Sequence, residues 1–173
     1  MSFAALRNNI IKSVSDYIGI PVILSNQVDP EMDCPFILYS VVTHYIPDNT
    51  IGHYDVVVRN GDAKEIRRED PTSVFSFTAC SQNREEDGMV IYGEDEAISL
   101  ADKLQGWFMH VGYDVLAASG AVVDSVNNVQ SRSFLQVDEE ARRWGFDAVI
   151  RYVRRDERVI ETIEKVNLRE VKI

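Results

Sequence analysis

The residues best suited to chemistry gather in one short stretch near the end of the chain. Positions 138–144 read Asp-Glu-Glu-Ala-Arg-Arg-Trp, which places three carboxylates, two guanidinium groups and an indole in seven residues. Neighbouring carboxylates can share a metal ion or a proton. Beside Arg142 and Arg143, an ion-pair network on a solvated loop is the interpretation we favour. Arginine and tryptophan also anchor protein interfaces.

Other candidate catalytic or metal-binding residues lack the spacing that such sites need. The histidines are His44, His53 and His110, and no pair has the His-x-x-x-His spacing of a metal site. Cys34 and Cys80 lie far apart without a Cys-x-x-Cys motif, so reduced thiols are expected. The nine glycines are scattered and form no phosphate-binding loop. We therefore expect no catalytic residue, no metal and no cofactor.

The charge of the chain is unevenly distributed. The net charge is −10, and the residues from Arg132 onward hold ten Lys/Arg against nine Asp/Glu, so the acidity belongs to the first 131 residues. A nucleic-acid binder needs an excess of basic residues, which this chain lacks. An acidic surface suits a passage through which DNA slides, and it also keeps a protein soluble. We see no export signal and no apolar run long enough to cross a membrane.

Two stretches have the periodicity of amphipathic helices. Residues 2–18 carry apolar residues every three or four positions, after Ser2 as a cap and before Gly19 as a stop. Residues 94–111 carry a second wide apolar stripe that includes Trp107, with three acidic residues in the first turn. We predict a helix over each stretch, and a connector over residues 114–120.

Several stretches favour β-strands. Residues 36–46, 54–59, 72–81 and 121–129 are rich in β-branched or aromatic residues. Residues 146–153 alternate, which predicts that Phe146, Ala148, Ile150 and Tyr152 share a buried face. We expect this strand to form a hairpin with residues 134–137, with 138–144 at its tip. Residues 82–88 are predicted to be a polar loop, and the charged residues 60–71 a mobile insertion.

This order of elements predicts an α+β fold. Long helices that alternate with hairpins favour a mainly antiparallel sheet with both helices packed on one face. We expect a single domain over residues 1–155, followed by a C-terminal extension over 156–173. That extension fits neither the helical nor the strand period, and it could cover the sheet edge or lie on a neighbouring subunit.

Four stretches resemble a family of tailed-bacteriophage and prophage neck proteins, the tail terminator or tail completion proteins. The first three are Phe-Ile-Leu-Tyr-Ser-Val at 36–41, Phe-Ser-Phe-Thr-Ala at 75–79, and the helix ending in Trp107-Phe108 before Gly112. The most specific is Arg132-x-Phe134 leading into Glu-x-Arg-Arg-Trp-Gly-Phe-Asp-Ala-Val-Ile-Arg at 140–151. The resemblance spans residues 1–153.

The resemblance implies a structural protein of the virion, assembled in the host cytoplasm. Members of the family form a ring, commonly a hexamer, that caps the tail tube, stops its polymerisation and joins it to the head connector. DNA passes through the ring without specific binding. The predicted contacts with a second subunit or the tube are Arg132, Glu139, Glu140, Arg142, Arg143 and Trp144. A head–tail adaptor ring beside the portal is the alternative, and a small metal-dependent hydrolase or a monomeric ligand-binding module are alternatives of another class.

Overall fold

The N-terminal helix α1, Phe3–Ile18, forms as its sequence predicts. A computed structural model describes residues 2–25, 33–48, 50–59, 62–133 and 141–161. The Ser2 hydroxyl accepts a hydrogen bond from the Ala5 N–H, and Gly19 ends the helix at a φ of 82°. The buried side chains recur every four residues, namely Leu6, Ile10, Val14 and Ile18. The helix therefore presents one apolar stripe to the core.

The second helical region is less regular than the predicted single helix over 94–111. Helix α2, Gly93–Gly106, passes into a π-helical turn η1, Trp107–Val111, and then into a short helix α3, Tyr113–Ala118. The predicted connector at 114–120 is thus mostly helical. A Cβ atom at Gly112 would lie 2.6 Å from the Trp107 ring, so the buried indole fills the space where a larger residue would stand. Packing of Trp107 reshapes the helix at this point.

The main sheet is mixed but mostly antiparallel, which confirms the predicted fold class. Its strand order is β1-β2-β5-β10-β8, with the short β9 also paired to β10. Among the described strands of this sheet, only β1 runs parallel to its neighbour, β2. The strands are β1 Val22–Leu24, β2 Phe36–Ile46, β5 Thr72–Ser81, β8 Ala121–Val126, β9 Gln130–Ser131 and β10 Arg142–Tyr152.

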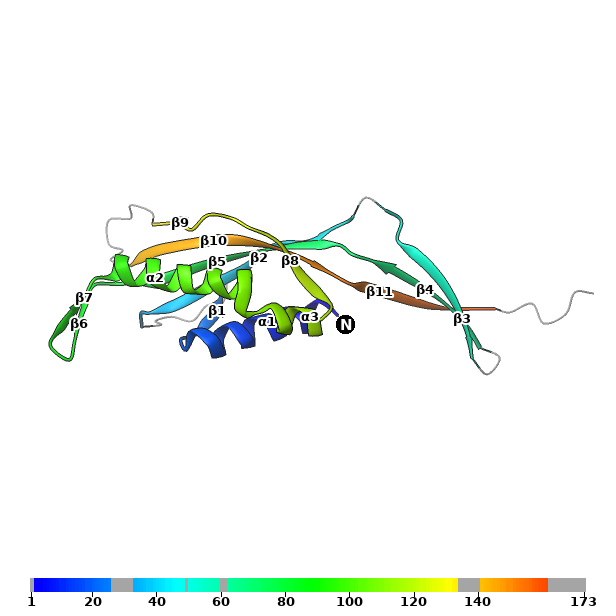
Figure 1. Ribbon diagram of the computed structural model, residues 1–173, viewed down its shortest axis with the longest axis horizontal. Helices are drawn as coiled ribbons and strands as arrows, with labels where there is room; N and C mark the ends of the chain where they lie inside the picture. The colour runs from blue at the N-terminus through cyan, green and yellow to red at the C-terminus, as the bar shows by residue number, and fades with distance from the viewer. Residues whose placement is uncertain (1, 26–32, 49, 60–61, 134–140, 162–173) are drawn as a thin grey trace, which may run out of the picture.

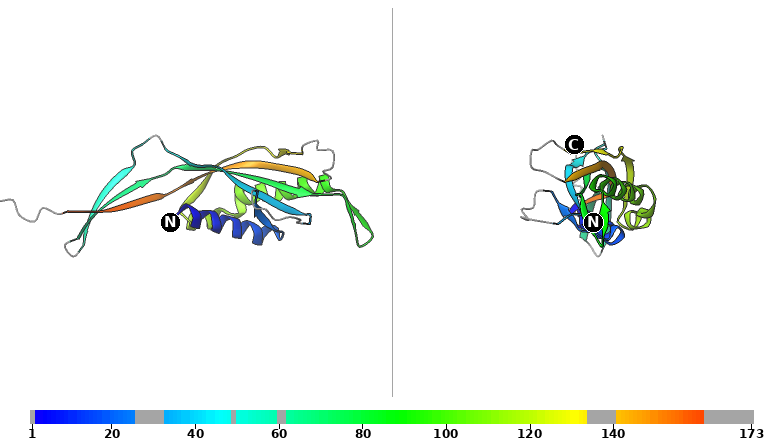
Figure 2. Two further views of the ribbon diagram at one scale, coloured as in Figure 1. Left: turned by 180° about the vertical axis from the view of Figure 1, so that it is seen from behind. Right: turned by 90° about the vertical axis from the view of Figure 1, so that its left-hand side faces the viewer.

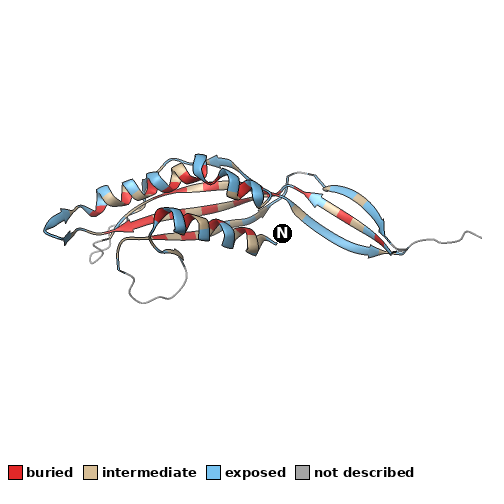
Figure 3. Cartoon of the chain, turned by 60° about the horizontal axis from the view of Figure 1, so that its bottom comes forward, coloured by how far each residue is buried: buried red, intermediate tan, exposed pale blue. Residues whose placement is uncertain are grey.

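The hydrophobic core lies between this sheet and the helices, which cover one face (Figure 1, Figure 3). Phe146, Ala148 and Ile150 are fully buried, as the alternation predicts. Phe75 and Phe77 of the neighbouring strand β5 are also fully buried. Strands β5 and β10 approach closely at Gly145, where a Cβ atom would lie 2.1 Å from the Phe77 carbonyl oxygen. We call this two-layer unit the body.

A second, three-stranded sheet projects from the body, and we call it the arm (Figure 1). Its order is β11-β4-β3, from β3 His53–Arg59, β4 Asp62–Glu69 and β11 Arg154–Ile160. Residues 62–69, within the segment 60–71 that was predicted to be a mobile charged insertion, form the central strand of the arm. The boundary predicted at residue 155 falls inside β11. Ala63 and Ile66 are buried, and cross-strand ion pairs offset the charge that argued against order.

A short hairpin extends from the other end of the body. Strands β6, Arg84–Glu86, and β7, Met89–Ile91, pair across a turn in which Asp87 and Gly88 both have positive φ. The predicted polar loop at 82–88 is therefore a β-hairpin with an Asp-Gly turn. Views from the front and from behind place this hairpin and the arm at opposite ends of an elongated molecule (Figure 1, Figure 2).

Candidate assembly interface

A groove crosses the sheet face that the helices leave uncovered. It has a volume of about 470 Å³, and strands β2, β5 and β10 form its floor. Of the residues predicted to form an interface, Arg132 and Arg143 both line it. Polar side chains such as Ser40, Ser76 and Thr78 line it together with the apolar side chains of Leu38 and Val42. Such a mixed surface is typical of protein contacts.

The Arg132 side chain lies at this groove and links the two central strands, β5 and β10. Its Nη1 atom donates to the Ser76 and Thr78 hydroxyls, at 2.5 and 3.1 Å, and to the Phe77 carbonyl at 3.3 Å. Its Nη2 atom donates to Asp147 Oδ1 at 2.7 Å. The guanidinium thus links β5 to β10, with 19% of the side chain exposed. Arg132 therefore stabilises the lining of the groove and is also partly exposed at the surface.

Arg143 lies opposite Cys80 in the pairing of β10 with β5. Its backbone N–H donates to the Ser133 hydroxyl at 2.9 Å, which continues the pairing beyond β9. Burial raises the pKa of the Cys80 thiol to about 11, and burial also raises the pKa of Cys34. Both cysteines are free, as expected, and at neutral pH they are protonated and therefore poor nucleophiles.

The other predicted interface residues do not join the groove. Arg142 is exposed at the start of β10, within a strand rather than at the predicted hairpin tip. Trp144 is half-buried and packs against the core. The partner of β10 on this side is β9, through Trp144 and Gly145. Glu139 and Glu140, like the predicted partner strand at 134–137, lie outside the described residues.

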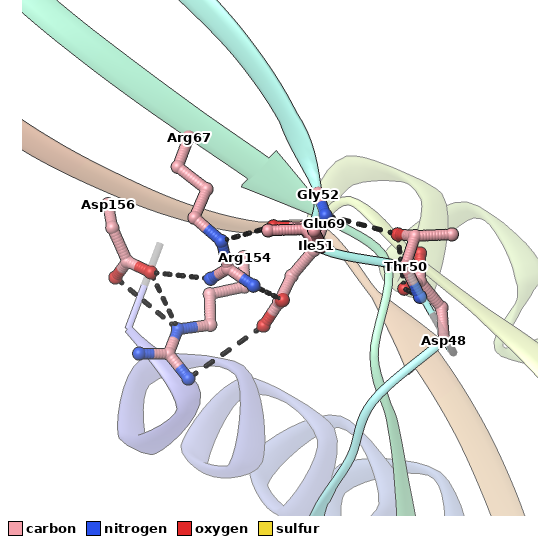
Figure 4. Close-up of polar contacts among 8 residues, drawn as sticks. All are labelled: Asp48, Thr50, Ile51, Gly52, Arg67, Glu69, Arg154 and Asp156. Carbon is pink, nitrogen blue, oxygen red and sulfur yellow. Dashed lines mark hydrogen bonds and ion pairs between the residues drawn. The ribbon is translucent and has the colours of Figure 1, made fainter.

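The root of the arm holds a cluster of charged side chains that sequence reasoning missed (Figure 4). The Glu69 side chain is fully buried and pairs with Arg67, and its Oε1 atom lies 3.8 Å from Arg154 Nη1. Both arginines also pair with Asp156, at 3.2 and 3.1 Å. Arg67 further donates to the Ile51 carbonyl at 2.7 Å. The cluster ties β4 to β11 where the arm leaves the body.

Beyond its root, the arm has two chemically different sides. Ion pairs join β4 to β11, as between Lys64 and Glu157 at 3.6 Å and between Glu65 and Arg158. Strand β3 instead carries Val56, Val57 and Val58, with Val56 58% exposed and Val58 61% exposed. In the sequence, the signal for this surface is a run of three valines beside a charged stretch, which by itself predicts only a strand.

A third cluster supports the hairpin at the opposite end. Arg84 makes a two-pronged contact with Glu96 of α2, at 2.6 and 2.9 Å, and the Ser81 hydroxyl donates to the same carboxylate. The hydrogen bonds from Arg84 lower the pKa of Glu96. Met89, Val90 and Tyr92 stay exposed on the hairpin side. At the end of the molecule away from the arm, the hairpin is thus held by an ion pair to α2 and has a partly apolar surface.

The described part of the chain contains no group of three or more His, Cys, Asp or Glu side chains that could hold a metal ion. No helix in it is long and apolar enough to span a membrane. Its features are instead surfaces: the groove, the arm and the hairpin formed by β6 and β7. These define a protein whose conspicuous surfaces suit contacts with other proteins.

The comparison with known families identifies which such protein it is. The family model described as phage neck terminator protein matches residues 8–173, nearly the whole chain. The chain therefore belongs to the phage neck terminator family, as the sequence resemblance predicted, and it is a structural protein of the phage neck and a component of the virion. The family is structural rather than enzymatic. Among curated proteins, none matches the chain.

Proposed function

We propose that the protein terminates the phage tail. Copies assemble into a ring, a hexamer, that caps the tail tube, stops its polymerisation and joins it to the head connector while DNA passes through the centre. The observation that carries this proposal is membership of the neck terminator family over nearly the whole chain. The elongated shape of the subunit, with different projections at its two ends, also supports it (Figure 2).

A closed ring needs two different surfaces on each subunit that fit each other. The molecule supplies unlike surfaces in its arm, its hairpin and its groove. We assign Arg132 and Arg143 to the contact with a neighbouring subunit or the tail tube, because both line the groove on the face that the helices leave open. Arg142 is assigned to the same contact because it is exposed at the start of β10. The proposed contact also includes Glu139, Glu140 and Trp144. Trp144 would contribute through the part of its side chain that stays exposed.

The charge of the chain fits the passage of DNA. A net charge of −10 repels the phosphate backbone at short range, so DNA can move past the protein without binding. This charge is compatible with a passive channel.

Electron microscopy of particles assembled without this protein tests the proposal. A terminator predicts tail tubes of irregular or excessive length that are not joined to heads, with normal tails restored when the protein is supplied in trans. An adaptor beside the portal predicts tails of normal length that fail to join filled heads. Normal virions in the absence of the protein would overturn both.

Charge reversal at Arg142 tests the assigned contact. Because the side chain is exposed, Arg142→Glu should leave the melting temperature of the isolated protein unchanged. It should nevertheless reduce tail joining or tail-length control in particles. Lys12→Glu is the matched control, since it makes the same charge change at an exposed position on α1. Equal numbers of joined, normal-length tails with both variants would remove Arg142 from the contact.

A further inference from the structure

The arm has two open edges. Within the described chain, β3 and β11 each pair only with β4, so the outer backbone groups of both strands lack a strand partner. Proteins usually protect such edges with lysine, proline, bulges or very short strands. Strand β3 has none of these: it is seven residues long, contains no lysine or proline, and pairs with β4 in an unbroken register. The outer edge of β3 can therefore pair with another strand.

The two edges run in the same direction. Strand β4 is antiparallel to β3 and also antiparallel to β11, so β3 and β11 are parallel to each other across the arm. A second copy related by rotation about an axis along these strands would place its β11 beside the first copy's β3, pointing the same way. The arm can thus be repeated side by side without turning any copy over.

Apolar residues of the two edges match at the far end of the strands, whereas nearer the root Asp55 is level with Glu157, because both pair with Ile66. Val57 is level with Val159, because both pair with Lys64. Val58 is level with Ile160 in the same way, through Ala63. Val159 is 74% exposed, so a neighbouring side chain can pack against it. β-Branched side chains facing each other across adjacent strands stabilise a sheet, so the two edges present complementary apolar ends at the same level.

We propose that β3 of one copy pairs in parallel with β11 of a second copy, so that the arms of the assembly join into one continuous sheet. The proposal rests on the ring assembly proposed above and names the strands that make the contact. Main-chain hydrogen bonds supply the attraction, and the valines select the register. A pairing of β3 with β3 of a second copy would end at a dimer and leave both β11 edges open. The parallel pairing uses both edges of every copy.

Disulfide trapping tests this contact directly. In Val57→Cys/Val159→Cys, the two cysteines of one chain stand two strand spacings apart, about 10 Å, which exceeds the roughly 7 Å limit for a disulfide. Oxidation of the full-length protein, at high concentration and in isolated tails, should therefore give a ladder of cross-linked species beyond the dimer. Because barrels and rings stagger their strands, Val57→Cys/Glu157→Cys covers a register shifted by two residues.

The single variants are the controls, since Cys34 and Cys80 are present in all of them. In one outcome, mass measurement or microscopy shows that the protein forms a ring while neither double variant cross-links. That result would overturn the strand pairing but not the proposed terminator function. A dimer formed by Val57→Cys alone would show β3–β3 pairing and overturn the parallel contact. Failure of the wild-type chain to associate, both in solution and on tails, would overturn the ring and the pairing together.

A second variant separates strand pairing from general loss of fold. Val56→Lys adds a charge to the exposed centre of β3 and should abolish the ladder without lowering the melting temperature. Val90→Lys makes the same change at a valine of similar exposure, 62%, on the hairpin at the far end of the molecule. The ladder should survive Val90→Lys. Its survival in Val56→Lys as well would contradict the proposed contact.

Discussion

The body and the arm are both built on β-sheets, but they obtain their order in different ways. The body buries one face of its sheet under helices, with aromatic side chains such as Phe75 and Phe77 fully enclosed. Among the described residues, no helix covers either face of the arm, which relies on ion pairs, a few buried side chains and its root cluster (Figure 3). A small sheet needs at least three strands with a hydrophobic face, or packing against a helix, to be stable in water. The contrast indicates that the body is built for stability and the arm for contact.

The largest effect is expected in the body, at Phe77. Its ring is fully buried and lies 4.9 Å from Phe108 and 5.9 Å from Phe146 between ring centroids. Phe77→Ala should lower the free energy of unfolding by about 3–5 kcal/mol, the usual cost of such a cavity. Thermal denaturation should show a melting temperature lower by about 10 °C. A change of less than about 2 °C would mean that the core is not organised around this ring.

An intermediate and local effect is expected at the root of the arm. Glu69→Gln removes the buried charge between Arg67 and Arg154, although Asp156 still pairs with both arginines. We expect a loss of about 1–3 kcal/mol, confined to the arm. Hydrogen exchange should show faster exchange in β3, β4 and β11, with unchanged protection in β5 and β10.

Hydrogen exchange also tests whether the body and the arm unfold separately. Ile66→Ala is the matched apolar change in the arm, where the side chain is 3% exposed and no helix of the described residues covers it. It should likewise affect only arm amides. Equal loss of protection in body and arm for either variant would show that the two sheets unfold as one unit.

The smallest effect is expected at Glu96 and depends on pH. The folded-state pKa of this carboxyl is lowered from 4.5 by hydrogen bonds from Arg84, so its contribution is present above pH 4.5 and is lost as the pH falls below that value. Glu96→Gln should cost about 1 kcal/mol at pH 7, where the partly exposed pair is screened by solvent. The difference in melting temperature between wild type and variant should shrink as the pH is lowered to about 3. A difference that stayed constant would assign the effect to packing.

Much of the body could be predicted from local sequence patterns. Helix α1 follows from its four-residue apolar spacing and its caps, and β2 and β5 follow from their β-branched and aromatic residues. The alternation of Phe146, Ala148 and Ile150 gave the buried face of β10. Continued backwards, the same alternation places Trp144 on the core side, and the Asp87-Gly88 pair signals the hairpin turn.

The arm and the candidate site could not be predicted in the same way. Strand β4 is ordered by pairing with β11, about ninety residues later, as in Arg68 opposite Arg155. No local pattern reports a partner at that separation. The charges that suggested disorder prove to be the cross-strand contacts themselves. Similarly, Arg132 looked like a surface residue because its acceptors, Ser76 and Thr78, lie on a distant strand.

The common direction of β3 and β11 has a consequence for the neck as a whole. If every arm in an assembly points the same way, the outer ends of all the arms lie along one rim and all the roots along the other. The two rims then differ in shape and chemistry. A collar of this kind has an inherent top and bottom, as a joint between two unlike neighbours requires.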